Sequence, residues 1–275
     1  MRQVIHGHFW TLLPQLAHTI SPESAPRDEP WETHLDDPTM GRLRLTGWIK
    51  ARPHHDTLFV LIHGLGGSHD SRYVLSMARA CDRAGVSYMR FNMRGADRSG
   101  EDIYHAGTTE DLHAMLRSAS LRSFTRIYLI GFSLGGHIVM RWALDADRDP
   151  RVAAIATVCA PLDLAFGAAA IQRPLGRPYQ WHILNGLKEM YAAAKLRGRP
   201  LPIPVDRVRS FKTIFEWDDE VVVPRFGFAS RHDYYASQAA GPRLSEMALP
   251  TLFIAAEADP VVTAEQIRPW IAQAS

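Results

Sequence analysis

The sequence predicts an α/β fold in which a mostly parallel sheet carries helices on both faces. Three observations predict this class: short apolar runs recur along the chain, helical patterns separate them, and most runs are apolar throughout, as in strands covered on both faces. With 275 residues, of which 46% are hydrophobic and 22% charged, the chain can bury a sizeable core as one large domain or two small ones. The composition excludes a mainly disordered protein.

The predicted elements begin after residue 40. Residues 43–47 alternate apolar and polar side chains, as in a half-buried strand, and Thr57–Ile62 is a continuous apolar run typical of a buried strand. A helix is predicted over Arg72–Ala84, with Gly85 as its stop, and a strand over Val86–Asn92. A βαβ unit is therefore expected in this part of the chain.

The alternation continues in the second part of the chain. Thr108, with Asp111 three residues later, is expected to cap a helix that runs to about Leu121. The remaining elements are a buried strand, a helix, two further strands and a last helix, predicted over Arg126–Gly131, Leu134–Ala146, Val152–Cys159, Pro250–Ala256 and from about Thr263.

Residues 162–249 depart from this rhythm because they form a stretch longer than any single crossover needs, and it carries Pro174, Pro178, Pro200, Pro202 and Pro204 among its prolines. We expect a cap inserted between two parts of one core, 41–161 and 250–275, and lying over the carboxyl edge of the sheet. Its middle, Trp181–Arg197, is predicted as an amphipathic helix. The apolar stripe of that helix is Ile183, Leu184, Leu187, Met190 and Tyr191.

The same insertion is locally basic, with nine basic and two acidic residues between Ile171 and Lys212. A solvated surface is the simpler interpretation, and a weak contact with an anionic membrane surface is the alternative. The chain as a whole has 31 Lys and Arg against 29 Asp and Glu, a net charge of +2, so a nucleic-acid partner is not expected.

The chain's beginning and its cysteines are less informative. Residues 1–40 are rich in Pro, Glu, Asp and Ser and are expected to form an irregular N-terminal arm. The arm lacks the uninterrupted apolar core of a signal peptide, and no apolar run approaches the ~20 residues of a membrane span, so a cytoplasmic protein is expected. Cys81 and Cys159 form no CxxC pair and lie in no histidine cluster, which predicts buried free thiols and no metal site.

The most specific pattern is GFSLG at residues 131–135, directly after one predicted strand and directly before a helix. A serine on such a sharp turn points its Oγ clear of the backbone, and the flanking glycines let neighbouring chain pass close by. The amino end of the following helix also favours an anion at this place. Ser133 is therefore predicted to be a nucleophile.

A second glycine-rich pattern, HGLGG at residues 63–67, follows the strand Thr57–Ile62. In this type of site one oxyanion donor is the N–H of the residue after the nucleophile, here Leu134. The other donor comes from the glycine-rich loop, where Leu65 is the candidate. A simple tight turn is the alternative interpretation.

A candidate acid follows the predicted strand Pro250–Ala256. An acid just beyond a late strand is where the carboxylate that orients a catalytic histidine belongs, and Asp259 stands there. Glu257 and Asp163 remain alternatives for the same role.

With these patterns the sequence resembles the YheT-like branch of the α/β-hydrolases, bacterial relatives of the ABHD-type membrane lipid esterases. The resemblance implies an α/β-hydrolase fold and a serine esterase that acts on small-molecule esters with short or medium acyl chains, without a cofactor. It implies Ser133 as the nucleophile and Asp259 as the triad acid. The matching segments are His8, Thr11 and Pro14, HGLGGSHDSRY (63–73), NMRGADRSG (92–100), IYHAGTTEDL (103–112), GFSLGG (131–136), APLDL (160–164), RPLGRPYQ (173–180), GFASRHDYY (227–235) and LPTLFIAAEADP (249–260).

The catalytic histidine of that family has no counterpart in this sequence. Family members follow the acid with a helix, a strand and a loop bearing the histidine, which needs more than about twenty residues, whereas 275 minus 259 leaves 16. We expect a truncated form of a longer hydrolase, with impaired activity, rather than a natural variant that has lost the triad. The alternative functions are a non-catalytic binding protein and an acyltransferase to an alcohol.

The other histidines are not expected to replace this base. His63 is expected to make a structural hydrogen bond in the oxyanion turn, and His137 to pack below the nucleophile, one helical turn further on. Ordinary loop, helix or cap roles are expected for His105, His113, His182 and His232, although His232 could line the cleft.

Overall fold

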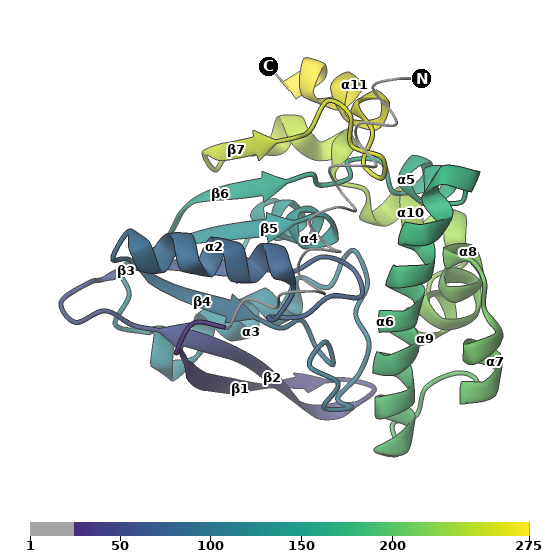
Figure 1. Cartoon of the computed structure of the whole chain (residues 1–275), viewed down its shortest axis with the longest axis horizontal. Coiled ribbons are helices and arrows are strands. Elements are labelled where there is room, and N and C mark those ends of the chain that lie inside the picture. The colour runs from purple at the N-terminus through teal and green to yellow at the C-terminus, as the bar shows by residue number, and fades with distance from the viewer. Residues whose placement is uncertain (1–24, 275) are drawn as a thin grey trace.

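The computed structural model describes residues 25–274 and shows a seven-stranded sheet with helices on both faces (Figure 1). The strand order is β1-β2-β4-β3-β5-β6-β7; the β1–β2 and β2–β4 pairs are antiparallel and the other pairs are parallel. The predicted α/β class is confirmed. The strands are β1 (Glu29–Asp37), β2 (Gly41–Lys50), β3 (Thr57–Ile62), β4 (Ser87–Phe91), β5 (Arg126–Phe132), β6 (Val152–Val158) and β7 (Thr251–Ile254).

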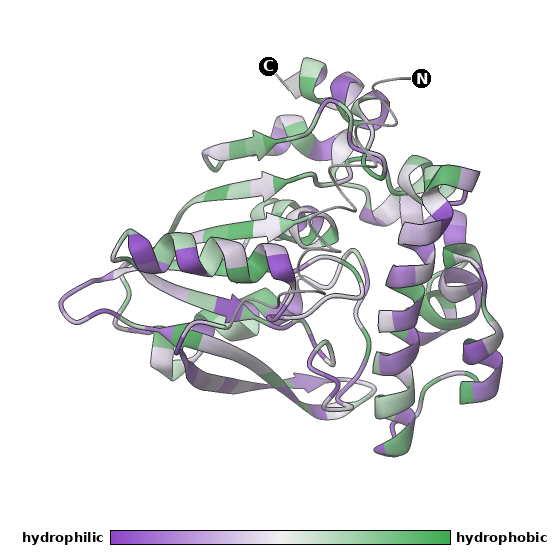
Figure 2. Ribbon diagram, viewed as in Figure 1, coloured by the Kyte–Doolittle hydropathy of each residue, from purple (hydrophilic) through white to green (hydrophobic). Residues whose placement is uncertain are grey.

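Helices from different parts of the chain cover the two faces. Val74, Ala78 and Cys81 of α2 pack with β-strand residues in a small cluster on one face, while α3 and α4 contribute to the main core on the other. In Figure 2, α2 and α6 carry hydrophobic and hydrophilic residues in alternating bands, as amphipathic helices do. The helices are α2 (Arg72–Arg83), α3 (Glu110–Arg117), α4 (Leu134–Ala143), α5 (Leu164–Ala170), α6 (Arg177–Leu196), α7 (Val205–Ser210), α8 (Ile214–Trp217), α9 (Val223–Phe226), α10 (Arg231–Gln238) and α11 (Ala264–Ala274).

Strand β1 corrects the prediction of an irregular arm for part of residues 1–40. Residues 29–37 pair antiparallel with residues 41–49 of β2. Their polar residues hid the strand, because β1 is an edge strand with one buried apolar anchor, Trp31. The indole N–H of Trp31 donates to Ser120 Oγ at 2.6 Å, and its ring packs edge-on against Phe91. The arm residues His8, Thr11 and Pro14 lie outside the described residues.

The predicted cap at Thr108 is wrong. Helix α3 begins at Glu110, and Thr108 Oγ1 instead accepts a hydrogen bond from His105 N at 2.9 Å. The carboxylate of Asp111 is buried and accepts from the backbone and side chain of Arg94, so it cannot complete a capping box. A buried ion pair has taken the place of the predicted local contact.

Two further elements differ from their predictions. Strand β7 is not buried: it lies at the edge of the sheet, and Leu252 and Ile254 are 59% and 46% exposed. Helix α4 ends at Ala143, three residues earlier than expected. The other predicted strands and helix α2 match within a few residues, and Gly85 ends α2 as expected, with φ of 71°.

The chain between β6 and β7 consists of helices and loops, and α6 stands beside the carboxyl ends of the strands (Figure 1). Of the predicted stripe of α6, Leu184, Leu187, Met190 and Tyr191 are buried. Arg225 of α9 anchors the insertion to the core through a buried pair with Asp102, at 2.6 Å. The division of the chain at residues 162 and 249 remains a prediction.

Most of the basic side chains in this insertion bond within the protein. Lys188 donates to the carbonyls of Arg209 and Phe211, and Arg199 pairs with Glu101. None of the helices described between residues 25 and 274 is long and apolar enough to cross a membrane.

Candidate active site

Ser133 stands on a strained turn between β5 and α4. Its φ of 49° and ψ of −123° lie outside the regions that non-glycine residues prefer, and its N–H donates to Val158 O at 2.8 Å. A Cβ on Gly131 would lie 2.5 Å from Gly135 O, and one on Gly135 would lie 2.2 Å from His63 O. The predicted sharp turn is confirmed, and close backbone packing requires its glycines.

The loop 63–67 lies against this turn and is held by two tyrosines. Tyr73 Oη accepts the N–H of Gly64 at 2.9 Å. Tyr104 Oη accepts the N–H of Gly66 at 3.0 Å and donates to Gly64 O at 3.1 Å. Among the described residues, the N–H groups of Leu65 and Leu134 make no hydrogen bond. The two predicted donors, Leu65 in this loop and Leu134 at the start of α4, therefore have unoccupied N–H groups, whereas the N–H groups of Gly64, Gly66 and Gly67 are occupied.

His63 has the structural role expected of it. The ring is fully buried, Nδ1 donates to Gly64 O at 2.8 Å, and Nε2 accepts from Met93 N at 3.3 Å. Burial lowers the pKa of His63 to about 4. A neutral ring with both nitrogens occupied cannot take a proton from Ser133.

Other histidines are similarly engaged. The two ring nitrogens of His137 each lie 2.8 Å from a carbonyl, that of Pro161 and that of Gln238, and burial lowers its pKa. His105 Nδ1 accepts from Gly107 N, and burial lowers the pKa of His105 to about 3. In the described part of the chain no histidine hydrogen-bonds Ser133 Oγ.

His232 was expected to be able to line the cleft and His182 was not, but the structure shows the reverse. His232 is exposed on α10 and is not among the residues that line the two cavities at Ser133. His182, at the start of the cap helix α6, lines the outer of these cavities. The prediction could not find it because His182 carries no motif and its position depends on how α6 lies over the sheet.

His113, Asp145 and Asp147 form the candidate metal group among residues 25–274. The indole N–H of Trp142 donates to His113 Nδ1 at 3.3 Å, so Nε2 carries the proton and donates it to Asp145 at 3.0 Å. A protonated Nε2 is not a metal ligand, so this group is better explained as a hydrogen-bonded chain.

Asp259 lies in the loop after β7 and lines the same outer cavity as Ser133. Its Oδ1 accepts the N–H groups of Val261 and Val262 at 2.8 and 2.9 Å. The carboxylate also faces Cys159, which is only half-buried, and burial together with this charge raises the pKa of the Cys159 thiol to about 12. Cys81 is buried as predicted.

The two alternative acids are used elsewhere. Glu257 is exposed and pairs with Arg268 at 2.6 Å. Asp163 caps α5 by accepting the N–H of Phe166 at 2.9 Å. Of the three carboxylates considered from the sequence, Asp259 is the one that shares a cavity with Ser133.

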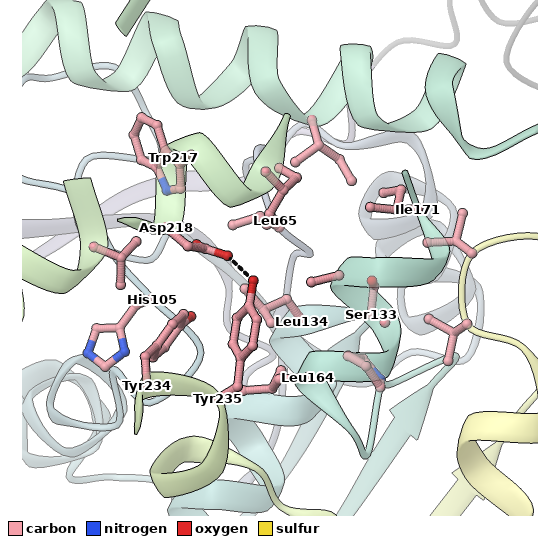
Figure 3. A pocket seen from close by; sticks show the side chains of 18 of the residues that line it. Leu65, His105, Ser133, Leu134, Leu164, Ile171, Trp217, Asp218, Tyr234 and Tyr235 are labelled. Atoms are coloured by element: carbon pink, nitrogen blue, oxygen red, sulfur yellow. Dashed lines mark hydrogen bonds between the residues drawn. The ribbon is translucent and has the colours of Figure 1, made fainter. Parts of the chain in front are cut away.

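Two cavities meet at Ser133. The inner one, of about 100 Å³, is mainly apolar and lies between the core and helices α5, α6, α8 and α10 (Figure 3). The outer one, of about 590 Å³, is more polar and includes Arg72, Arg98 and Asp259. Both cavities are lined by Leu65, Ser133, Ile183, Val261 and Val262.

Asp218 is the residue of this site that the sequence did not indicate. It is buried in the inner cavity, where its Oδ2 accepts the hydroxyl of Tyr235 at 2.5 Å (Figure 3), and burial raises the pKa of Asp218 to about 7. The next two residues, Asp219 and Glu220, pair outward with arginines. Nothing in the run of three acids distinguishes the inward one from its neighbours.

Comparison with known proteins places this fold and site in a family. The profile described as the alpha/beta hydrolase fold matches residues 57–274. The chain belongs to the α/β-hydrolase fold family. This α/β-hydrolase is 32% identical over 271 residues to YheT of Escherichia coli (strain K12), which covers 94% of this chain and 77% of YheT. The resemblance noted from the sequence is thereby confirmed.

Two further likenesses are more distant. The medium-chain fatty acid ethyl ester synthase/esterase 2 of Saccharomyces cerevisiae is 26% identical over 273 residues, and this α/β-hydrolase spans 89% of its own length but only 58% of that relative. The esterase Pf2001 of Pyrococcus furiosus superimposes with a TM-score of 0.56 at 14% identity, over 92% of this chain and 83% of the other. This second likeness shows the fold alone.

Proposed function

We propose that this α/β-hydrolase is a serine carboxylesterase that hydrolyses short or medium acyl esters through an acyl-enzyme. The observation that carries the proposal is the position of Ser133: it lies on a strained turn where a small and a larger cavity meet, beside two backbone N–H groups without other partners. Relatives that include an esterase support the same chemistry.

In the proposed reaction Ser133 Oγ attacks the ester carbonyl, and the N–H groups of Leu65 and Leu134 stabilise the oxyanion. Asp259 orients the imidazole that accepts the serine proton and returns it to the leaving alcohol. That imidazole belongs in the outer cavity, which both Ser133 and Asp259 line. The reaction as proposed needs no cofactor.

The two cavities divide the substrate. The inner cavity, lined by side chains such as Leu164, Ile171 and Ile183, takes the acyl chain because burial of methylene groups favours binding there. The more polar outer cavity takes the alcohol part of the ester. Turnover of p-nitrophenyl esters should therefore rise from acetate to longer chains, and a rate that stays flat or falls would contradict this assignment.

The nucleophile is tested with a fluorophosphonate probe, which labels an activated serine. The experiment uses the wild-type protein and its Ser133→Ala variant. We expect the wild-type protein to label at Ser133, and the Ser133→Ala variant to lose both labelling and ester hydrolysis by about 10⁴-fold or more. Absence of labelling, labelling at another residue, or hydrolysis that survives in Ser133→Ala would overturn the proposal.

Acyl transfer to an alcohol is a second candidate, favoured by the yeast relative, which is named as an ethyl ester synthase as well as an esterase. The larger, outer cavity beside Ser133 gives an alcohol room to replace water. Measuring ethyl ester and free acid from one p-nitrophenyl ester at increasing ethanol concentration separates the two reactions. A product ratio that follows the solvent composition would leave hydrolysis as the function, whereas an ethyl ester excess would support transfer.

A cytoplasmic location and a weak contact of the basic cap with anionic membranes also belong to this proposal. Cell fractionation and sedimentation with anionic vesicles test them.

A further inference from the structure

Asp218 is an unusual group for an acyl-binding cavity. Among the described residues that line the inner cavity it is the one carboxylate, in a lining made mostly of aliphatic and aromatic side chains. Only 6% of Asp218 is exposed. Burying a carboxylate in such surroundings is costly unless its oxygens find partners.

Tyr235 provides a partner for one oxygen only. Its hydroxyl donates to Asp218 Oδ2, while Oδ1 makes no hydrogen bond with any described residue. The nearest basic side chain on the same helix as Tyr235, that of Arg231, pairs with Asp219 instead. Asp218 therefore keeps an acceptor that the protein leaves without a partner.

The backbone directs this carboxylate inward. Residues 218–222 form a single π-helical turn, η3, between α8 and α9. The extra residue in such a turn shifts the register of the side chains, and turns of this kind are frequent at functional sites. Asp218 faces Tyr235 in the cavity, whereas Asp219 and Glu220 face arginines outside it.

We propose that Asp218 and Tyr235 form a subsite that binds a hydroxyl group carried by the acyl chain, so that the preferred substrates are esters of hydroxy acids. The proposal rests on the proposed esterase function. Figure 3 shows Asp218 and Ser133 apart in the pocket, with Tyr235 between them. The hydroxyl therefore lies away from the reacting carbonyl, further along the chain.

A hydroxyl suits this group better than an ammonium does. Burial raises the pKa of Asp218 to about 7, so both its ionised and its protonated form are populated near neutral pH. A hydroxyl can donate to the carboxylate and accept from the carboxylic acid, whereas an ammonium can only donate. A hydroxyl thus matches both forms of the subsite.

Binding tests this inference without any turnover. The protein carrying Ser133→Ala is titrated with octanoic acid and with 3-, 5- and 8-hydroxyoctanoic acids in a calorimeter. We expect one hydroxy acid to bind about tenfold more tightly than octanoic acid, as a hydrogen bond to a charged group allows. Asp218→Leu should abolish this preference while still binding octanoic acid, and Asp218→Asn, which keeps the shape of the side chain, should reduce it.

Asp219→Asn is the matched control, because it removes a neighbouring carboxylate that points out of the cavity. It should leave every affinity unchanged. The inference is overturned if no hydroxy acid binds more tightly than octanoic acid, if the preference survives Asp218→Leu, or if 8-aminooctanoic acid outcompetes the hydroxy acids in an Asp218-dependent way. Since this background lacks Ser133 Oγ, failure of the subsite and failure of the esterase proposal are observed separately.

Discussion

The two sides of the inner cavity are built differently. On the core side, backbone atoms hold the groups proposed for catalysis: Ser133 on its strained turn, and the loop 63–67 between Tyr73 and Tyr104. On the cap side, helices α5, α6, α8 and α10 contribute side chains that fill space, and Asp218 of the turn η3 presents an acceptor. Under the proposed function, the core would hold the reacting groups and the cap would hold the acyl chain.

The core side and the cap side of the cavity are in direct contact at two glycines, Gly66 and Gly186. A Cβ on Gly186 of α6 would lie 2.3 Å from Gly66 O, and a Cβ on Gly66 would lie 2.8 Å from Ile183 O. Helix α6 therefore packs directly against the backbone of the loop 63–67. Because this contact leaves no space for a side chain, a displacement of α6 would be transmitted to the loop.

The largest effect is expected from Gly135→Ala on the core side. An alanine Cβ at this position would lie 2.2 Å from His63 O, so helix α4 and the loop 63–67 must separate. We expect the free energy of unfolding to fall by about 2 kcal/mol or more and kcat/KM for p-nitrophenyl octanoate to fall by about a hundredfold. Urea unfolding and initial rates measure the two losses.

Gly167→Ala is the counterpart on the cap side. Gly167 is helical and lines the same cavity, and its added Cβ would meet the side-chain end of Gln266 at 3.2 Å and Pro161 Cβ at 3.8 Å, but no backbone atom. Alanine should stabilise α5 by up to about 1 kcal/mol with little loss of activity. If both glycine variants lose activity equally, the distinction between the two sides is wrong.

The next effect concerns the hydroxyl of Tyr104, which bridges Gly66 N–H and Gly64 O. Tyr104→Phe leaves a buried N–H unsatisfied, which costs about 1–3 kcal/mol, and loosens the loop that holds Leu65. We expect kcat to fall roughly tenfold with a small change in KM, as for lost transition-state stabilisation. Tyr128→Phe, outside both cavities, is the control, and a Tyr104→Phe effect confined to KM would argue against this role.

The same contrast decides what the sequence could predict. The GFSLG and HGLGG patterns predict the local backbone geometry, because strained turns and close backbone contacts restrict which residues fit there. Ser133, Leu65 and Leu134 could therefore be assigned to these turns from the sequence. The parallel strands were predictable from continuous apolar runs. Strand β1 was not, because a polar edge strand has few apolar positions by which the sequence could reveal it.

The cap side could not be placed in this way. The direction of Asp218 depends on a π-helical turn, and the position of His182 depends on how α6 lies over the sheet. Asp111 has a suitable position in the sequence for a helix cap, but its carboxylate instead accepts a hydrogen bond from the side chain of Arg94, 17 residues earlier. Tertiary contacts determine where these side chains point, and no local sequence pattern reveals such contacts.

Ala168→Phe tests whether cap side chains set the acyl length. Ala168 of α5 is partly buried and lines the cavity of about 100 Å³, so a phenyl ring would fill it. We expect hydrolysis of p-nitrophenyl octanoate to fall about tenfold while that of the acetate changes by less than about twofold. Ala165→Phe, on the exposed face of the same helix, should change neither rate; a parallel loss for both esters in Ala168→Phe would place the acyl chain elsewhere.

The last effect concerns stability rather than activity: a pH dependence of unfolding that arises from Asp218. Since burial raises its pKa from 3.8 to about 7, the folded protein holds this proton more tightly than the unfolded chain does. Asp218 therefore favours folding at low pH, and this contribution is lost as the pH rises through about 7. Asp218→Asn does not titrate, so its free energy of unfolding should gain on that of the wild type by about 1.4 kcal/mol for each unit between pH 5 and pH 7, and by little above pH 8.

The groups around Asp218 refine this measurement. Arg231 and the Tyr235 hydroxyl lower the pKa of Asp218, and Asp219 raises it. Tyr235→Phe removes a hydrogen bond that favours the carboxylate, so the loss of stability should then extend to higher pH than in the wild type. Urea unfolding of the three proteins at pH 5, 6, 7 and 8 gives the curves. A constant difference between Asp218→Asn and the wild type over this range would mean that Asp218 is fully ionised in the cavity, and a cationic acyl substituent would then suit the cap better than a hydroxyl.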